Sequence, residues 1–243
     1  MPSGRVSLLY RLTPAAVRGE RATNMSRPLE SLRRTLVDSR SSASLSDRLR
    51  ARRFRLIYET FPDITEMHVL DLGGTVSFWL KAHTHPSRVT LMNVSDQHSP
   101  EPWMQCLVGD VCEPPAALQR ESFDLVFSNS VIEHVGGHAR RLRMAEVVHD
   151  LGDHHWIQTP YRYFPIEPHW LFPGFQFLPT KLQGHIGARW PLTWSGRVPY
   201  ENALADAMDV ELLDRTQMQH YFPGSRLVAE RVMGIPKSLI AIR

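Results

Sequence analysis

The sequence predicts an α/β fold, a doubly wound and mostly parallel sheet with an antiparallel β-hairpin at its C-terminal end. From residue 67 onward, short apolar runs alternate with turn-rich or helical segments, the order typical of a parallel sheet covered by helices. The last two β-rich runs are joined by a short segment that contains Gly234 and Pro236, which favours a hairpin. With 42% hydrophobic residues in 243, the chain is long enough to bury one sizeable core.

The pattern places the elements as follows. The expected parallel strands are Met67–Leu72, Arg88–Val94, Met104–Val108, Phe123–Asn129 and Trp156–Gln158. The expected helices are Leu45–Phe61, with apolar residues on one face, Val76–Ala82 after the first strand, and Ala139–Leu151. The hairpin pairs Leu227–Val232 with Ser238–Ile242 around the turn Met233–Lys237, which brings the expected sheet to seven strands.

The N-terminal region is strongly basic. Residues 1–56 hold thirteen arginines, no lysine and four acidic residues, a net charge of +9, so a total of +3 leaves −6 for the rest. We therefore divide the chain into a basic arm over residues 1–44, partly disordered or helical, and a domain over residues 45–243. The arm is interpreted as a surface extension, a transit peptide, or a segment that contacts anionic lipid or nucleic acid. Met25 is an alternative start.

Composition bears on the compartment. No apolar run approaches the ~18 residues of a membrane span. Cys106 and Cys112 lack the spacing of metal ligands and are too few for a disulfide framework, which favours a reducing compartment. We expect a cytoplasmic protein, with association to a membrane surface through the arm, or import into an organelle, as alternatives.

The stretch MHVLDLGGTVSFW is typical of a loop that follows the first strand of a nucleotide-binding fold. An apolar strand ends in Asp71, and a turn with Gly73 and Gly74 follows. The dinucleotide fingerprint needs G-x-G-x-x-G, but Thr75 and Ser77 stand where further glycines are expected. Together with the terminal hairpin, this spacing disfavours a dinucleotide-dependent dehydrogenase.

Four segments, VLDLGG, LMNV, VGDV and FDLVFSNSVIEHV, occur in this order, one at each of the first four expected strands. In this arrangement residues 45–243 resemble a class I S-adenosylmethionine (SAM)-dependent methyltransferase of the type 11-like group. The resemblance implies a Rossmann-like, seven-stranded sheet, SAM as cofactor and S-adenosylhomocysteine as product. The phrase YRYFPIEPHWLFP is similar to a subgroup associated with polysaccharide or glycolipid biosynthesis.

The resemblance also implies how the first loop meets the cofactor. Gly73 and Gly74 allow the backbone to approach the amino-acid part of SAM, and Asp71 binds its ammonium group directly or through water. SAM brings no pyrophosphate, so the demand for three spaced glycines is relaxed. Thr75, with Ser77 beside it, either donates its hydroxyl to the SAM carboxylate or partly blocks the pocket.

The remaining cofactor contacts are implied in the same way. Asn93 stands where the family usually has an acidic residue for the ribose hydroxyls, and an amide lacks the charge-assisted strength of a carboxylate. Asp110 accepts from the adenine amino group, and the backbone of Val111 contacts the ring edge. Ser128 and Asn129 line the methyl-transfer site at the carboxyl end of the fourth strand.

Methyl transfer from a sulfonium is an in-line displacement, and an alcohol acceptor adds the need for a base. Two histidines are candidates, His134 in IEHV and His169 in FPIEPH, with Glu167 placed to orient His169 or to bind a polar acceptor. Structural alternatives are a His134 that packs beside the cofactor and a His169 that anchors its loop. The segment HDLGDHH lies at the amino end of the fifth strand, away from the catalytic edge, and we assign no metal ligand.

An aromatic and proline-rich insertion follows the fifth strand. Residues 156–200 hold eleven of the twenty-two aromatic residues and seven of the eighteen prolines. We expect residues 161–200 to form a cap over the carboxyl edge of the sheet, where long insertions carry substrate contacts. The aromatic residues could stack on sugars, cover a lipid, stabilise the sulfonium, form a homodimer interface, or attach the cap to the body.

The favoured function is SAM-dependent O-methylation of a small molecule, a glycan or a glycolipid. An RNA methyltransferase that uses the basic arm is an alternative, although the fourth strand reads SNSV rather than the N-P-P-aromatic signature and the body is acidic. A non-catalytic protein with the same fold is the third possibility, which Thr75, Ser77 and Asn93 keep open.

Overall fold

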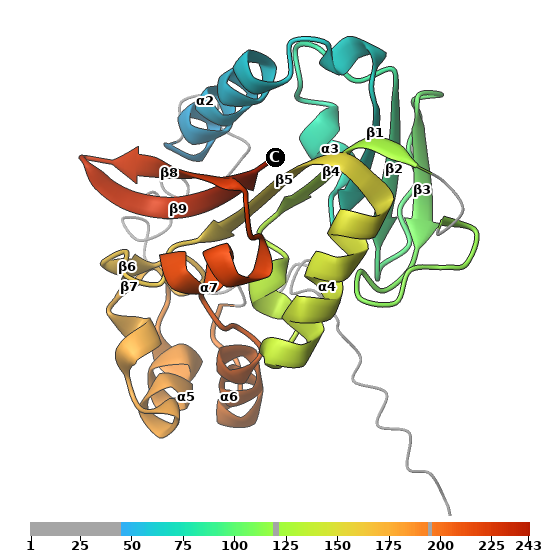
Figure 1. Cartoon of the computed structure of the whole chain (residues 1–243). Helices are drawn as coiled ribbons and strands as arrows, with labels where there is room; N and C mark the ends of the chain where they lie inside the picture. Colours follow the sequence, from blue (N-terminus) through green and yellow to red (C-terminus); the bar gives the residue numbers. More distant parts are fainter. Residues whose placement is uncertain (1–44, 119–121, 194–195) are drawn as a thin grey trace, which may run out of the picture.

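The computed structural model describes residues 45–118, 122–193 and 196–243 (Figure 1). Its centre is a seven-stranded sheet in the order β3-β2-β1-β4-β5-β9-β8. The strands are β1 (His68–Leu72), β2 (Arg88–Asn93), β3 (Met104–Val108), β4 (Phe123–Asn129), β5 (Gly152–Pro160), β8 (Arg226–Val232) and β9 (Ile235–Ile242). The basic arm, residues 1–44, lies outside the described residues, so the interpretations of its role stay predictions.

The sheet confirms the predicted fold class. β1, β2, β3, β4 and β5 pair in parallel, whereas β9 runs antiparallel to both β5 and β8. The strand order reverses between β1 and β4, the position at which open α/β sheets bind ligands beyond the carboxyl ends of their strands. β1, β2 and β4, in the middle of the sheet, are mostly buried apolar runs, as a sheet covered on both faces requires, whereas most of β3, at the edge, is partly or fully exposed.

Helices cover both faces of the sheet. One core joins the sheet to α2 (Leu45–Thr60) and α3 (Val76–Trp79), with Phe54, Ile57 and Trp79 among its buried side chains. The other core lies beneath α4 (Gly137–Leu151) and α7 (Arg215–Tyr221), which Figure 1 shows side by side. Phe54 and Ile57 lie on one face of α2, and Phe61 directly follows the helix; all three pack in the first of these cores, as predicted.

An ion pair ties α2 to the C-terminal hairpin. The guanidinium of Arg53 donates to both carboxylate oxygens of Glu230, over 2.9 and 2.7 Å. Ser238 also donates to this carboxylate. Burial alone would raise the pKa of Glu230, but its bonds to Arg53 and Ser238 hold the pKa below its usual value. One arginine of the basic N-terminal region therefore has a structural role.

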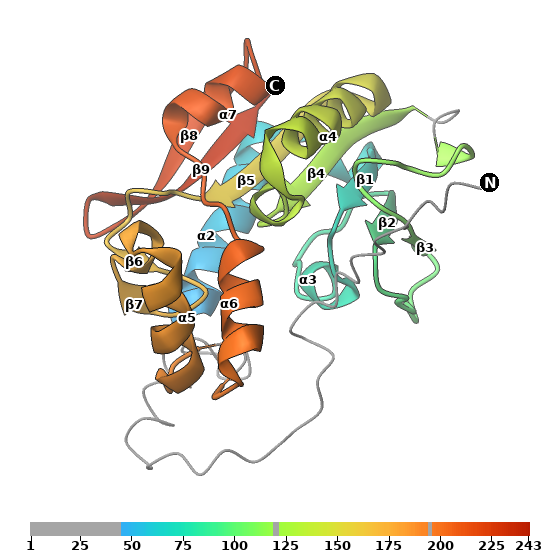
Figure 2. The same cartoon turned by 90° about the horizontal axis from the view of Figure 1, so that it is seen from below.

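The chain between β5 and α7 forms a small separate layer below the sheet edge (Figure 2). It contains β6 (Ile166–Glu167), β7 (Phe172–Pro173), η5 (Phe175–Phe177), α5 (Thr180–Arg189) and α6 (Tyr200–Met208). Trp170 and Phe175 stack with ring centroids 4.3 Å apart and form a core with Ala207. The layer thus extends past residue 200 through α6, because α5 and α6 pack on each other.

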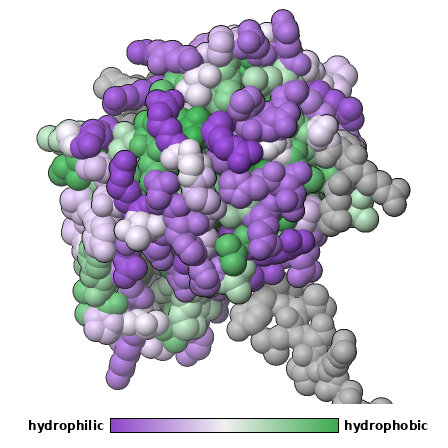
Figure 3. Space-filling view, viewed as in Figure 1, coloured by the Kyte–Doolittle hydropathy of each residue, from purple (hydrophilic) through white to green (hydrophobic). Residues whose placement is uncertain are grey.

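No helix in the described ranges is long and apolar enough to cross a bilayer. Figure 3 shows a mostly hydrophilic face over α4 and α7, with more apolar atoms at the lower left, over the layer of α5 and α6. The large apolar residues exposed in this layer include Tyr163, Ile166, Phe177 and Leu182.

Three elements differ most from the sequence-based expectation. α3 is one turn, Val76–Trp79, and does not reach Ala82, because the buried Trp79 is followed by residues that turn away toward Pro86. β5 starts at Gly152, since its polar residues gain partners from β4 and from the end of β9. The terminal turn is tighter than Met233–Lys237, as β9 already begins at Ile235.

Candidate functional site

The carboxyl ends of β1, β2, β4 and β5 meet at one edge of the sheet, because these strands are parallel. Each ends in a polar side chain or is followed by one. Asp71 is the next-to-last residue of β1, Asn93 ends β2, Asn129 ends β4, and Thr159 stands near the end of β5. The predicted cofactor and acceptor residues of these strands are therefore brought to one edge.

Asp71 is a buried carboxylate held by a tryptophan. Its Oδ2 accepts a hydrogen bond of 2.8 Å from the indole N–H of Trp79, and its exposed fraction is 1%. Burial raises the pKa of Asp71 to about 7, against the lowering effect of the bond from Trp79. Position 74 must be glycine here, because a Cβ would lie 1.8 Å from Asp71 Oδ2.

Buried polar atoms without partners mark the place for a ligand at this edge. Oδ1 of Asp71 and both amide atoms of Asn129 are buried and have no hydrogen-bond partner within the described part of the chain. Buried polar groups are nearly always paired, so these atoms call for a polar ligand. The amino-acid part of SAM carries an ammonium group, which fits the Asp71 carboxylate, and a carboxylate, which fits the Asn129 amide. These residues and the glycine loop would hold that part of the cofactor.

The glycine loop is packed against the segment after β4. Gly73 has a φ of +77°, a conformation that favours glycine, and a Cβ there would come within 2.5 Å of Val131. The hydroxyls of Thr75 and Ser77 lie 3.2 Å apart, exposed at the start of α3. Whether they contact a cofactor carboxylate stays a prediction.

Asn93 and Gln97 hold the glycine loop from the side. Asn93 Nδ2 donates to the carbonyls of Gly73 and Gly74, and its Oδ1 accepts from the backbone and hydroxyl of Ser95. Gln97 donates to the Gly74 carbonyl and accepts from the Val76 amide. The hydrogen-bonding capacity of Asn93 is thus used within the chain, and its role toward a ribose stays a prediction. The sequence pattern did not single out Gln97.

Asp110, predicted to contact adenine, is paired with an arginine. Arg140 donates to both of its oxygens, over 2.8 and 2.6 Å, and Oδ1 also accepts from the Cys112 amide. Val111, which lies between Asp110 and Cys112 in the sequence, is buried. No local pattern singles out Arg140 beyond its place on a helix, since the pair joins residues thirty positions apart. Ser128 donates to the Leu72 carbonyl and so links β4 to β1.

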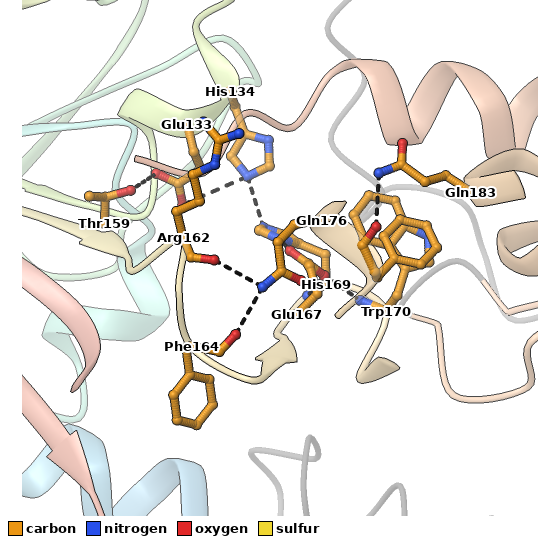
Figure 4. A network of polar contacts seen from close by, with 11 residues as sticks. Glu133, His134, Thr159, Arg162, Phe164, Glu167, His169, Trp170, Gln176 and Gln183 are labelled. Carbon is orange, nitrogen blue, oxygen red and sulfur yellow. Dashed lines mark hydrogen bonds and ion pairs between the residues drawn. The ribbon is translucent and has the colours of Figure 1, made fainter. Parts of the chain in front are cut away.

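His134 and His169 come together beside this edge (Figure 4). Their Nε2 atoms lie 3.2 Å apart, although the residues are 35 positions apart and belong to η4 (Ile132–His134) and the segment between β6 and β7. Burial and the neighbouring His169 lower the pKa of His134 to about 4. Although burial opposes it, the contact with Glu167 raises the pKa of His169. The two candidate bases thus form one unit.

Carboxylates flank the histidine pair on two sides. Glu167 accepts from His169 Nδ1 over 2.6 Å and from the amides of His169 and Trp170 over 2.7 and 2.9 Å. The geometry supports the expectation that Glu167 lies beside His169. Glu133 is fully buried, its Oε2 accepts from Thr159 over 2.9 Å, and its Oε1 lies 4.0 Å from His134 Nε2. Burial raises the pKa of Glu133 to about 7. The sequence pattern did not assign Glu133 or Thr159 a role.

A cavity of about 390 Å³ opens on the other side of Glu167, between the layer of α5 and α6 and the body. Aromatic and polar side chains share its lining, among them Arg162, Glu167, Trp170, Phe175, Gln176 and Gln183. Gln176 donates to the carbonyls of Arg162 and Phe164, while its Oε1 is buried without a partner in the described residues (Figure 4). The insertion after β5 therefore does form one wall of a cavity beside the histidines.

Comparisons with known proteins place this geometry in context. Residues 70–150 match the methyltransferase domain family. A SAM-dependent methyltransferase from Mesorhizobium loti superposes with a TM-score of 0.51 at 15% identity, covering 80% of this chain and 96% of that chain. The CurJ carbon methyltransferase superposes with a TM-score of 0.51 at 12% identity, covering 88% of this chain and 57% of that chain. At such identities the likeness shows the fold alone. A search of the curated proteins returned no match.

Proposed function

We propose that the chain is a SAM-dependent methyltransferase that transfers the methyl group of SAM to a hydroxyl group, because residues 70–150 match the methyltransferase domain family and the strand order is that of the expected sheet. The acceptor we propose is a glycan, a glycolipid or a small polyhydroxylated molecule. The observation that supports a hydroxyl acceptor is the His134–His169 pair, which lies between two buried carboxylates at the carboxyl edge of the sheet.

The reaction needs few groups beyond correct placement. The acceptor oxygen attacks the methyl carbon in line with the sulfonium, the C–S bond breaks, and its electron pair stays on sulfur as neutral S-adenosylhomocysteine. Asp71, Asn129 and the backbone of the glycine loop orient the donor. An alcohol oxygen must also lose its proton, and the cluster of Glu133, His134, Glu167 and His169 is where that proton is taken up.

The neighbouring cavity suits a polyhydroxylated acceptor. Arg162, Gln176 and Gln183 contribute polar groups to its lining, and the stacked rings of Trp170 and Phe175 contribute apolar wall, a mixture typical of pockets that bind small molecules. Glu167 lines the cavity and also touches His169, so a molecule in the cavity lies next to the proposed proton-accepting cluster.

The chemical stability of the product tests the proposal. SAM labelled in its methyl group is incubated with the protein and with glycan, glycolipid and RNA fractions. We expect label that resists alkali, as an ether does, and that acid hydrolysis releases as an O-methyl sugar or polyol. Label that alkali removes would identify a methyl ester, and label that ribonuclease releases would identify RNA. Either result would contradict hydroxyl methylation of a glycan or small molecule.

A non-catalytic role is favoured by one specific observation. Asn93 and Asp110, the residues expected to contact the ribose and adenine, are both engaged within the chain. Ligands that bind the folded state raise its melting temperature by mass action. Absence of any shift with millimolar SAM or S-adenosylhomocysteine would support the non-catalytic role and contradict the transferase.

A further inference from the structure

We propose that Glu133, His134 and His169 bind a divalent transition-metal ion. One ligand atom from each, a carboxylate oxygen and two imidazole nitrogens, lies within 4.8 Å of the other two. It is the one such group of three found within the described residues. The residues come from η4 and from the loop after β6, so the fold itself brings them together (Figure 4).

The distances match those of a coordination shell. Metal–nitrogen and metal–oxygen bonds of about 2.0–2.2 Å in a tetrahedral site place neighbouring ligand atoms roughly 3.3 Å apart. The two Nε2 atoms are 3.2 Å apart, and Glu133 Oε1 lies 4.0 Å from His134 Nε2. A movement of the carboxylate by about 1 Å would complete three bonds to one ion.

The other polar atom of each ligand is already held, as metal ligands usually require. Nδ1 of His169 lies 2.6 Å from the Glu167 carboxylate, which presents Nε2 toward the centre of the group. Oε2 of Glu133 accepts from Thr159, which turns Oε1 toward the same centre. His134 makes a hydrogen bond with the backbone of Asp209.

A buried carboxylate oxygen without a partner is the second observation. Glu133 is 0% exposed, and its Oε1 has no hydrogen-bond partner among the described residues. Leaving a buried carboxylate oxygen unpaired is costly, and an ion between it and the imidazoles would remove that cost. The two histidines alone do not pair with this oxygen, because their Nε2 atoms face each other.

The ligand set selects the class of ion. Two imidazoles and one carboxylate suit Zn²⁺, Mn²⁺, Fe²⁺ or Co²⁺, whereas Mg²⁺ and Ca²⁺ prefer oxygen ligands. The histidines of HDLGDHH do not form a comparable group in the structure, although His149 and His155 lie near each other at the amino end of β5. Residues 1–44 contain no histidine or cysteine.

An ion here would deepen the proposed function, and this consequence rests on that function. Three protein ligands leave a coordination position for the acceptor oxygen. A bound divalent ion lowers the pKa of a coordinated O–H group, so the oxygen loses its proton to water and then takes the methyl group while the S–CH₃ bond breaks. The histidines then act as ligands rather than as free bases.

Metal binding can be measured without SAM or acceptor. The full chain is stripped with EDTA and titrated with Zn²⁺, Mn²⁺ and Co²⁺, with calorimetry for stoichiometry and the visible absorption of Co²⁺ for ligation by nitrogen. We expect one ion per chain. His134→Ala, His169→Ala and Glu133→Gln should lose that ion, and Glu167→Gln should bind it about 10- to 100-fold more weakly. His154→Ala, an exposed histidine at the amino end of β5, is the matched control and should bind as the native chain does.

Failure of the metal site and failure of the transferase give different results. No ion at one equivalent, or equal binding by the native chain and Glu133→Gln, overturns the metal site. This glutamine is isosteric, so it stays informative if the alanine variants fail to fold. Methyl transfer that persists after EDTA has removed the ion contradicts the catalytic role of the ion and leaves the proposed function intact. One bound ion without methyl transfer to any hydroxyl supports the site and contradicts the function.

Discussion

The indole N–H of Trp79 donates a 2.8 Å hydrogen bond to Oδ2 of Asp71, so that a side chain of α3 fixes the carboxylate at the end of β1. Oδ1 of Asp71 stays buried without a hydrogen-bond partner among the described residues, near the end of the strand where the cofactor is expected. The stretch DLGGTVSFW is therefore more than a loop with unusual glycine spacing. Its tryptophan orients the acid, and its second glycine leaves room for it.

Removing the indole donor should destabilise the fold. In Trp79→Phe, Oδ2 of Asp71 loses its partner while still buried, and we expect a loss of about 1–3 kcal/mol in the free energy of unfolding. Denaturant unfolding measures this loss. Trp103→Phe is the control, because its indole bonds to the partly exposed Glu101 and should matter less. Equal losses in the two variants would contradict the assigned role of Trp79.

Affinity for S-adenosylhomocysteine should rise with pH. Burial raises the pKa of Asp71 to about 7, so below that pH the carboxyl is mostly neutral and binds an ammonium weakly. Between pH 5.5 and 7.5 the dissociation constant should fall by at most about tenfold per pH unit. Calorimetry on Asp71→Asn should show weak binding and a flat profile. A steep profile in that variant would assign the titration to another group, such as Glu133.

Stability without ligand should show the opposite trend. A carboxyl with a folded-state pKa raised above its unfolded value contributes stability that is present below the unfolded pKa and is lost as pH rises through the folded pKa. For Asp71 the window runs from about pH 4 to about pH 7. The melting temperature of Asp71→Asn should therefore rise relative to that of the native chain as the pH increases across this window. A constant difference would contradict the raised pKa.

Gly73 should tolerate alanine worse than a glycine of the same backbone conformation. Gly73 and Gly224 have φ angles of +77° and +79°, but a Cβ at Gly73 would meet Val131 at 2.5 Å, whereas one at Gly224 meets open space. Gly224→Ala should cost about 1 kcal/mol from backbone strain alone. Gly73→Ala should cost more and also weaken binding of S-adenosylhomocysteine. Similar unfolding energies and unchanged binding would show that the loop gives way easily.

The Arg53–Glu230 pair should contribute to stability above pH 4.5. In Arg53→Gln, Glu230 stays largely buried without its partner, and we expect a loss of about 3 kcal/mol. Because the pKa of Glu230 is lowered in the fold, this stability is present above the unfolded pKa and is lost as pH falls through the folded pKa. Arg143→Gln breaks a half-exposed pair with Glu146 and should cost less than about 0.5 kcal/mol. Equal costs would contradict the structural role of Arg53.

The sequence predicted the sheet well because buried parallel strands are continuous apolar runs. The bounds of β3 and β4 agree with the prediction, and β2 differs by one residue. The length of β5 was missed because its first residues are polar. His155 is nevertheless buried and bonded to Ser225 across 70 residues. Strand pairing of this kind is set by the tertiary fold and leaves no local pattern.

The order of the motifs predicted which residues lie at one edge of the sheet, but not most of the contacts that they make there. Parallel strands bring Asp71 and Asn129 to one edge, which the order of motifs could indicate. The meeting of His134 with His169, and of Asp110 with Arg140, joins residues that only the fold brings together. Glu133 carried no signal of burial, because glutamate beside histidine near a helical turn is usually exposed.

The transfer of labelled methyl from SAM to one alkali-stable acceptor, compared among matched histidine variants, tests the central claim most directly. We predict that His134→Ala and His169→Ala lose turnover by about 100-fold or more while still binding S-adenosylhomocysteine, and that His154→Ala keeps native turnover. Turnover within a few-fold of native in both variants would show that the histidine pair takes no part in methyl transfer, and would contradict the account.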